Sequence, residues 1–214
     1  MFVDCGDIIL SKYCFYAIQE QLATNRVVDL YVWPWINEDG GRVSGCRDMS
    51  TPGKIYKREF LEVYNLYPYD HGAGSFAAED CGLNLSCYAI MEDYTYDDDT
   101  PHMAQFELPI YKTRTDKNSL TYKNNKEFWV NCLPGIVDNA IYCIHNCEYA
   151  NIHTEIILDR INLFLIDLYK IFLQCTKKKP EYLEDYWQRI RQFYFQIYKK
   201  YENEPGNETQ QMLY

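Results

Sequence analysis

The sequence has little positive charge for its size. Lysine and arginine total 21 against 31 aspartate and glutamate residues, so the formal net charge is −10. Nucleic-acid surfaces and surfaces that bind anionic membranes need clustered basic side chains. The only basic run, Lys177 to Lys179, precedes Pro180 and is typical of the end of a helix. The sequence therefore predicts neither a nucleic-acid partner nor a membrane partner.

Signals that direct a chain into or across a membrane are also missing. Residues 1–4 lack the basic start and apolar continuation of a signal peptide. The most apolar stretch, Ile161 to Phe172, is too short to span a bilayer and contains Asn162, Asp167 and Lys170. We expect a secreted protein in its mature form, without its signal peptide; the alternative is a cytoplasmic protein.

Recognisable catalytic and metal-binding motifs are lacking as well. The chain has no P-loop, Rossmann glycine pattern, nucleophile elbow or His-Glu-x-x-His motif. On a helix, Cys143 and Cys147 share a face while His145 points elsewhere, so one zinc ion cannot readily take all three. We therefore predict no enzymatic activity, no cofactor and no metal. An enzyme of an unrecognised family is the alternative.

Tyrosine and cysteine are abundant, with 21 and nine residues respectively. Tyrosine supplies large amphipathic contact area. Nine cysteines is an odd number, so at least one thiol is free or pairs between chains. The alternative to disulfides is a set of reduced, buried thiols that pack as small apolar groups. The disulfide candidates are Cys5, Cys14, Cys81, Cys87, Cys132, Cys143, Cys147 and Cys175.

The first half of the chain predicts helices with one short β hairpin. Apolar residues at helical spacing indicate helices over residues 7–24 and 55–64. Residues 27–35 have strand character, and the glycines of residues 37–41 favour a turn that leads into a second strand. Residues 92–99 are strongly acidic, and we expect a solvated loop there.

The last third predicts a long helical hairpin. Helices are expected over residues 134–149, from 151 to the lysine run, and over 181–201. The fold class is therefore mainly α, a helical bundle with a minor hairpin. Exposed aromatic side chains suit interfaces, which makes the last helix the predicted contact surface. The interaction candidates are Tyr186, Trp187, Tyr194, Tyr198 and Tyr201.

A cysteine followed by a Tyr-Cys pair occurs twice. In each copy we expect the first cysteine in a loop and the last on the buried face of a helix. The repetition predicts two related helical units, residues 1–75 and 76–214, which either stand apart or pack as a single domain. The two copies consist of Cys5, Tyr13 and Cys14, and of Cys132, Tyr142 and Cys143.

These paired motifs in a tyrosine-rich chain resemble the bicycle family, the paired cysteine-tyrosine-cysteine proteins that gall-inducing aphids secrete into plants. The spacing within the motif differs between the two copies. The resemblance implies a secreted effector that acts in host tissue, and it carries over no catalytic residue. We therefore expect a non-enzymatic effector that binds an unknown host protein. The alternative is a viral or intracellular structural or host-modulating protein with reduced cysteines.

Overall fold

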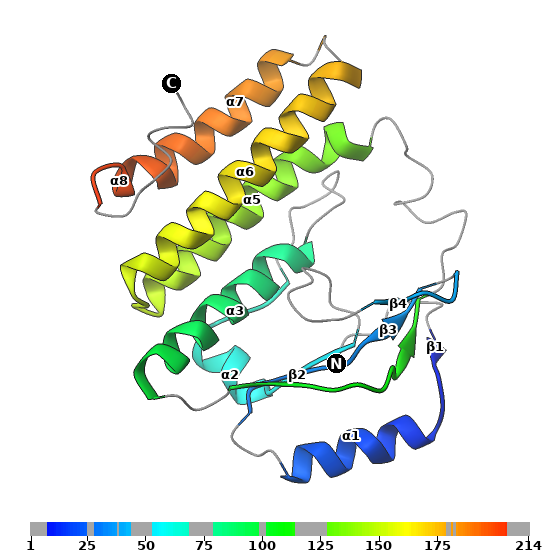
Figure 1. The fold of residues 1–214 in the computed structure, drawn as a ribbon. Coiled ribbons are helices and arrows are strands. Elements are labelled where there is room, and N and C mark those ends of the chain that lie inside the picture. The colour runs from blue at the N-terminus through cyan, green and yellow to red at the C-terminus, as the bar shows by residue number, and fades with distance from the viewer. Residues whose placement is uncertain are drawn as a thin grey trace.

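The protein is mostly helical and also contains two small sheets, as Figure 1 shows. The prediction of a mainly α protein is therefore confirmed for the secondary-structure content. The computed structural model describes residues 8–24, 28–37, 39–43, 53–68, 79–98, 102–113, 128–178, 181 and 183–204.

Helix α1 lies by itself on one side of the strands, and α3, α5, α6 and α7 form a larger group on the other side (Figure 1). Helices α3, α5 and α6 pack against one another, and α7 packs on α5 and α6. A π-helical segment, η2, continues α7 into the short α8. The helices are α1 (Tyr13–Thr24), α2 (Arg58–Val63), α3 (Glu79–Asp98), α5 (Phe128–Tyr149), α6 (Thr154–Lys178), α7 (Leu183–Phe193), η2 (Tyr194–Tyr198) and α8 (Lys199–Tyr201).

The strands are short and pair across long sequence distances. One sheet has the order β1-β7-β3-β4 and the other β5-β2-β6. Strand β2 runs parallel to β6, and β3 runs parallel to β7, so two consecutive strands pair with two later consecutive strands. The strands are β1 (Ile8–Ile9), β2 (Leu30–Val32), β3 (Trp35–Ile36), β4 (Arg42–Val43), β5 (Lys54–Tyr56), β6 (Met103–Gln105) and β7 (Tyr111–Lys112).

The predicted hairpin is found as the β3–β4 pair, although most of its predicted first strand belongs to β2, which pairs with other strands. Trp35 faces Val43 in antiparallel register. The backbone N–H of Asn37 donates to the carbonyl of Gly41 at 2.8 Å, and Gly40 adopts a φ of 85°. Glycine takes this left-handed conformation at little cost, which is why the turn forms here.

Strand β2 separates two hydrophobic cores. Successive side chains of a strand point to opposite faces. Leu30 and Val32 accordingly lie in the main core with α3, α5 and α6, whereas Tyr31 and Trp33 lie in a smaller core with α1. Figure 1 shows α1 on one side of the strands and α3 on the other. Helix α1 is thus joined to the molecule through the smaller core.

The first helix is shorter than predicted. Residues 8 and 9 form β1, and the helix begins at Tyr13. Strand β1 pairs with β7, and the Leu10 N–H donates to the carbonyl of Ile110, so sheet hydrogen bonds replace the first helical turns. Of the predicted apolar stripe, Cys14 and Ile18 are buried, while Leu10 and Leu22 are exposed.

The helix predicted over residues 55–64 is shorter than expected, because its first two residues belong to a strand. Residues 54–56 form β5, which pairs antiparallel with β2, and α2 begins at Arg58. β-Sheet pairing with a distant segment overrides the local helical pattern here. Tyr56 and Phe60 are still buried in the main core, as their spacing predicted.

The acidic loop predicted over residues 92–99 is wrong, because α3 continues to Asp98. Its carboxylates hold the start and the body of α6. Asp93 Oδ1 accepts hydrogen bonds from the backbone N–H of His153 at 2.6 Å and from His153 Nδ1 at 2.7 Å, and Glu92 pairs with Arg160. Glu92 and Asp93 therefore serve the packing of α3 against α6.

Helix α5 also begins earlier than predicted, at Phe128 instead of Pro134. A proline in a helix interior removes one backbone hydrogen bond and its ring crowds the preceding turn, yet the helix continues through Pro134. Cys132 therefore lies within α5 and not in a loop. Helix α5 contacts α3 closely: the Gly82 N–H donates to Asn139 Oδ1 at 3.1 Å, and a Cβ at Gly82 would lie 2.5 Å from that oxygen.

The main core draws on both sides of residue 75. Val32 and Phe60 contribute from the first predicted unit, and Leu83 and Ile144 from the second. The two Cys-to-Tyr-Cys copies differ in their surroundings, since Cys14 lies in the smaller core and Cys143 in the main core. Tyr13 is exposed, whereas Tyr142 is buried and its hydroxyl donates to the Tyr67 carbonyl at 3.0 Å.

Candidate functional site

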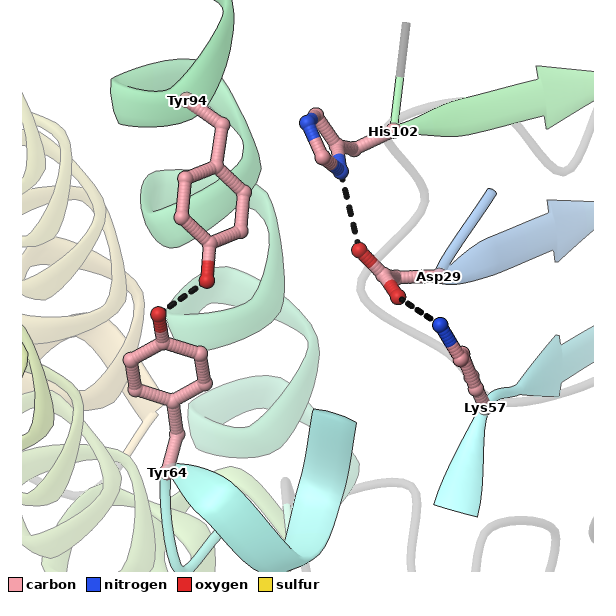
Figure 2. A network of polar contacts seen from close by, with 5 residues as sticks. All are labelled: Asp29, Lys57, Tyr64, Tyr94 and His102. Carbon is pink, nitrogen blue, oxygen red and sulfur yellow. Dashed lines mark hydrogen bonds and ion pairs between the residues drawn. The ribbon is translucent and has the colours of Figure 1, made fainter. Parts of the chain in front are cut away.

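The nearly buried carboxylate of Asp29 links neighbouring segments at one end of the three-stranded sheet (Figure 2). Asp29 Oδ2 lies 2.9 Å from His102 Nδ1, and Oδ1 lies 3.3 Å from Lys57 Nζ. The backbone repeats these links: the Asp29 N–H donates to the His102 carbonyl at 2.8 Å, and the Lys57 N–H donates to the Asp29 carbonyl at 2.8 Å. Asp29 directly precedes β2, His102 directly precedes β6, and Lys57 directly follows β5.

Two tyrosines connect this cluster to the helices, as Figure 2 shows. The Tyr94 ring of α3 lies 4.5 Å from the His102 ring, measured between centroids. Its hydroxyl hydrogen-bonds that of Tyr64, the residue that ends α2. Burial, together with that hydrogen bond, raises the pKa of Tyr94. The Tyr94 phenol therefore stays neutral at physiological pH and acts as a hydrogen-bonding group.

The Asp29–His102 pair has the orientation used in hydrolytic triads, in which a carboxylate fixes one imidazole nitrogen so that the other can act as a base. Here His102 Nε2 is buried and makes no hydrogen bond within the described part of the chain. Among the described residues, no nucleophile therefore lies within hydrogen-bonding distance of His102 Nε2. The arrangement acts as an ion-paired clamp between sheet and helices. Residues 29 and 102 are 73 positions apart, and no local pattern in the sequence connects them.

Five of the predicted disulfide candidates are free, buried thiols. Burial raises the pKa of Cys87, with a smaller opposing effect from the nearby charge of Lys54. A buried thiol of raised pKa is unreactive. Cys5 lies outside the described residues, and Cys132 and Cys175 lie in α5 and α6 without described side chains. The free thiols are Cys14, Cys81, Cys87, Cys143 and Cys147.

The Cys143–His145–Cys147 segment divides between two sides of α5. Both cysteines are buried in the main core, and His145 is exposed. Within the described ranges, no three His, Cys, Asp or Glu side chains are grouped so as to hold a metal ion. The segment contributes to helix packing.

Most of the residues predicted to form a contact surface on the last helix are buried or partly buried. Tyr186 and Tyr198 are only 3% and 2% exposed, because their rings pack in the main core, so they are corrected to core residues. Tyr194 and Tyr201 are partly buried, and the Tyr201 hydroxyl donates to Glu148 Oε1 at 2.8 Å. Trp187, 44% exposed, is the one candidate of the five that lies open to solvent.

Aromatic side chains are instead exposed on α1. Tyr13, Phe15 and Tyr16 are 66%, 55% and 67% exposed, and the Tyr13 and Tyr16 rings lie 6.4 Å apart between centroids. Lys12 Nζ lies 5.4 Å from the Tyr13 centroid. We use "outer face of α1" for the exposed helix residues Tyr13, Phe15, Tyr16 and Glu20 together with Lys12, which immediately precedes the helix.

Helix α1 is thus apolar on two sides. Cys14 and Ile18 anchor it in the smaller core, and the aromatic residues of the outer face point away from that core. Helical periodicity identified the anchoring stripe but not the second face. The sequence does contain a signal for this second face: three aromatic residues lie within two positions of Cys14 but outside the apolar stripe to which Cys14 belongs.

Two further findings concern membrane-spanning helices and similarity to known proteins. None of the helices in the described ranges has the length and apolar character needed to cross a bilayer. No protein-family model, no curated protein and no solved structure matches the chain.

Proposed function

We propose that this is a non-enzymatic protein that works by binding another protein through the outer face of α1. The observation that carries the proposal is the exposure of Tyr13, Phe15 and Tyr16 on one helix. Aromatic residues are enriched at protein interfaces because they offer a large contact area with few rotatable bonds. Side chains of this kind left together in solvent are typical of a surface that a partner covers.

The construction of α1 supports this role. A helix that served only to close the smaller core would need one apolar face, which Cys14 and Ile18 already provide. Its N-terminus is also held firmly: the Ser11 hydroxyl accepts a hydrogen bond from the Tyr13 N–H at 3.2 Å, and β1 pairs with β7. A rigidly presented aromatic face loses little conformational entropy on binding.

The proposed setting is that of a secreted effector acting on an unknown host protein, and it is supported by the resemblance to the bicycle family. A second setting is favoured by a separate observation. Five cysteines are buried free thiols, which suits an intracellular protein with reduced cysteines. Both settings use the same contact face.

Affinity capture from host-tissue extract tests the proposal. The purified protein is compared with the double variant Tyr13→Ser/Tyr16→Ser and with Tyr149→Ser, a control whose side chain is 71% exposed at the end of α5. We expect a protein that is retained by the wild type and the control but lost at least about tenfold with the double variant. Retention that is equal for all three folded proteins would contradict the proposal.

A further inference from the structure

We infer that the outer face of α1 binds a second copy of this chain, with the two helices antiparallel about a two-fold axis at Tyr16. The inference rests on the proposed function, because it uses the same contact face. It depends on the order of charged and aromatic residues along the helix. Lys12, Tyr16 and Glu20 are all exposed and follow one another at intervals of four residues.

Residues four apart lie on the same side of an α-helix. Glu20 therefore lies on the same side of α1 as Tyr16, and Lys12 immediately precedes the first turn of the helix, so opposite charges stand at the two ends of the aromatic group. Tyr13 and Phe15 lie to either side of Tyr16. The face thus has an aromatic centre with a positive end and a negative end.

A two-fold axis converts this order into self-complementarity. When two such helices cross antiparallel at Tyr16, Lys12 of each copy lies opposite Glu20 of the other. An isologous contact of this type uses the same patch on both subunits and closes at two chains. Both charge pairs form at once, and the aromatic side chains fill the centre.

The charge distribution of the molecule favours this face over others for self-association. Each chain carries a formal charge of −10, so two copies repel one another in general. The outer face of α1 has one positive and one negative residue, which lets two copies approach without a local excess of negative charge. The same balance disfavours an anionic membrane, which would need several basic residues on the face.

The size of the face indicates a weak dimer. A standard stable interface covers about 800 Å² on each partner, and three partly exposed aromatic side chains on a 12-residue helix supply less. We therefore expect association that depends on concentration, with a dissociation constant on the order of micromolar.

Sedimentation velocity over a range of concentrations tests the inference with two single charge reversals. Lys12→Glu places two negative pairs in the dimer, and Glu20→Lys places two positive pairs there. Each reversal should weaken dimerisation about tenfold. An equal mixture of the two variants should dimerise about as well as the wild type, because every facing pair again has opposite charges.

Glu20→Lys separates specific pairing from general repulsion. The substitution changes the formal charge from −10 to −8, so relief of repulsion alone would strengthen association. Glu59→Lys, at an exposed position of α2, makes the same charge change away from α1 and serves as the matched control. It should leave dimerisation unchanged or slightly stronger.

Three results would overturn the inference: a wild type that stays monomeric at every concentration, tighter association of Glu20→Lys, or a mixture no better than its components. The proposed function is judged separately. Were the wild type monomeric while capture from extract still depended on Tyr13 and Tyr16, only the inference would fall. Dimerisation through α1 with no partner captured through the same face would leave the inference standing and remove the effector role.

Discussion

His102 Nδ1 lies 2.9 Å from Asp29 Oδ2, next to the place where the parallel strands β2 and β6 begin to pair. The contact closes a crossover that includes α2 and α3, because both helices lie between these strands in the sequence. With Lys57 on the other carboxylate oxygen, Asp29 links three segments that no local pattern connects. This carboxylate therefore ties together segments of the chain that are far apart in sequence.

Replacing Asp29 with alanine should destabilise the protein by about 1–3 kcal/mol, because two charge-assisted contacts to a nearly buried side chain are lost. Urea unfolding followed by circular dichroism measures the change. The control is Glu62→Ala, which removes an exposed pair with Arg58 within α2 and should leave the midpoint unchanged. Equal effects of the two substitutions would show that Asp29 does not hold the sheet together.

Substitutions at two glycines distinguish the effect of backbone conformation from the effect of steric contact. Gly40 and Gly53 both have positive φ, 85° and 74°, so alanine is strained by the backbone at either position. A Cβ at Gly40 has nothing within 4 Å, whereas one at Gly53 would lie 2.3 Å from the carbonyl oxygen of Trp33. Gly53→Ala should therefore lower the thermal midpoint clearly more than Gly40→Ala. Similar midpoints for the two variants would contradict the tight contact between Gly53 and Trp33.

The buried phenol of Tyr56 predicts a loss of stability at alkaline pH. Its hydroxyl donates to Asn84 Oδ1 at 2.7 Å, and burial raises its pKa above the ordinary value of 10.0. The unfolded chain then releases this proton near pH 10 while the folded chain keeps it, so stability falls as the pH rises above that value. Tyr56→Phe should show a shallower decline between pH 9 and 11, although it is less stable at pH 7 by about 1 kcal/mol. A decline as steep as that of the wild type would exclude Tyr56 as a source.

The cysteines provide a test of the redox setting. Cys14, Cys81, Cys87, Cys143 and Cys147 are buried free thiols, so iodoacetamide should not modify them in the native protein. After denaturation without reductant, peptide mass spectrometry should find all five alkylated. Disulfide-linked peptides that include any of the five would instead favour the secreted framework.

Much of the helical architecture was predictable because long amphipathic patterns are local. The apolar face of α6, including Ile157, Ile161 and Phe164, repeats at three- and four-residue steps and packs in the main core as expected. The sheets were mostly not predictable. Their strands have two or three residues each, and β2 pairs with a strand more than 70 positions later. Periodicity cannot be read over so few residues.

The candidate site shows a related limit. The aromatic residues of the last helix and those of α1 look alike in sequence, yet Tyr198 is buried by neighbouring helices and Tyr16 is not. Which face of a helix is covered depends on elements distant in the chain. Helix α1 has one covering layer, the smaller core around Trp33, and α7 packs on both α5 and α6.

Hydroxyl-radical footprinting of the free and the bound protein tests the central claim, that the outer face of α1 is the contact surface. The bound state is the dimer at high concentration or the complex with a captured protein. We predict that oxidation of Tyr13, Phe15 and Tyr16 falls severalfold on binding, while that of the equally exposed Tyr149 is unchanged. Protection at Tyr149 with none on α1 would contradict the account.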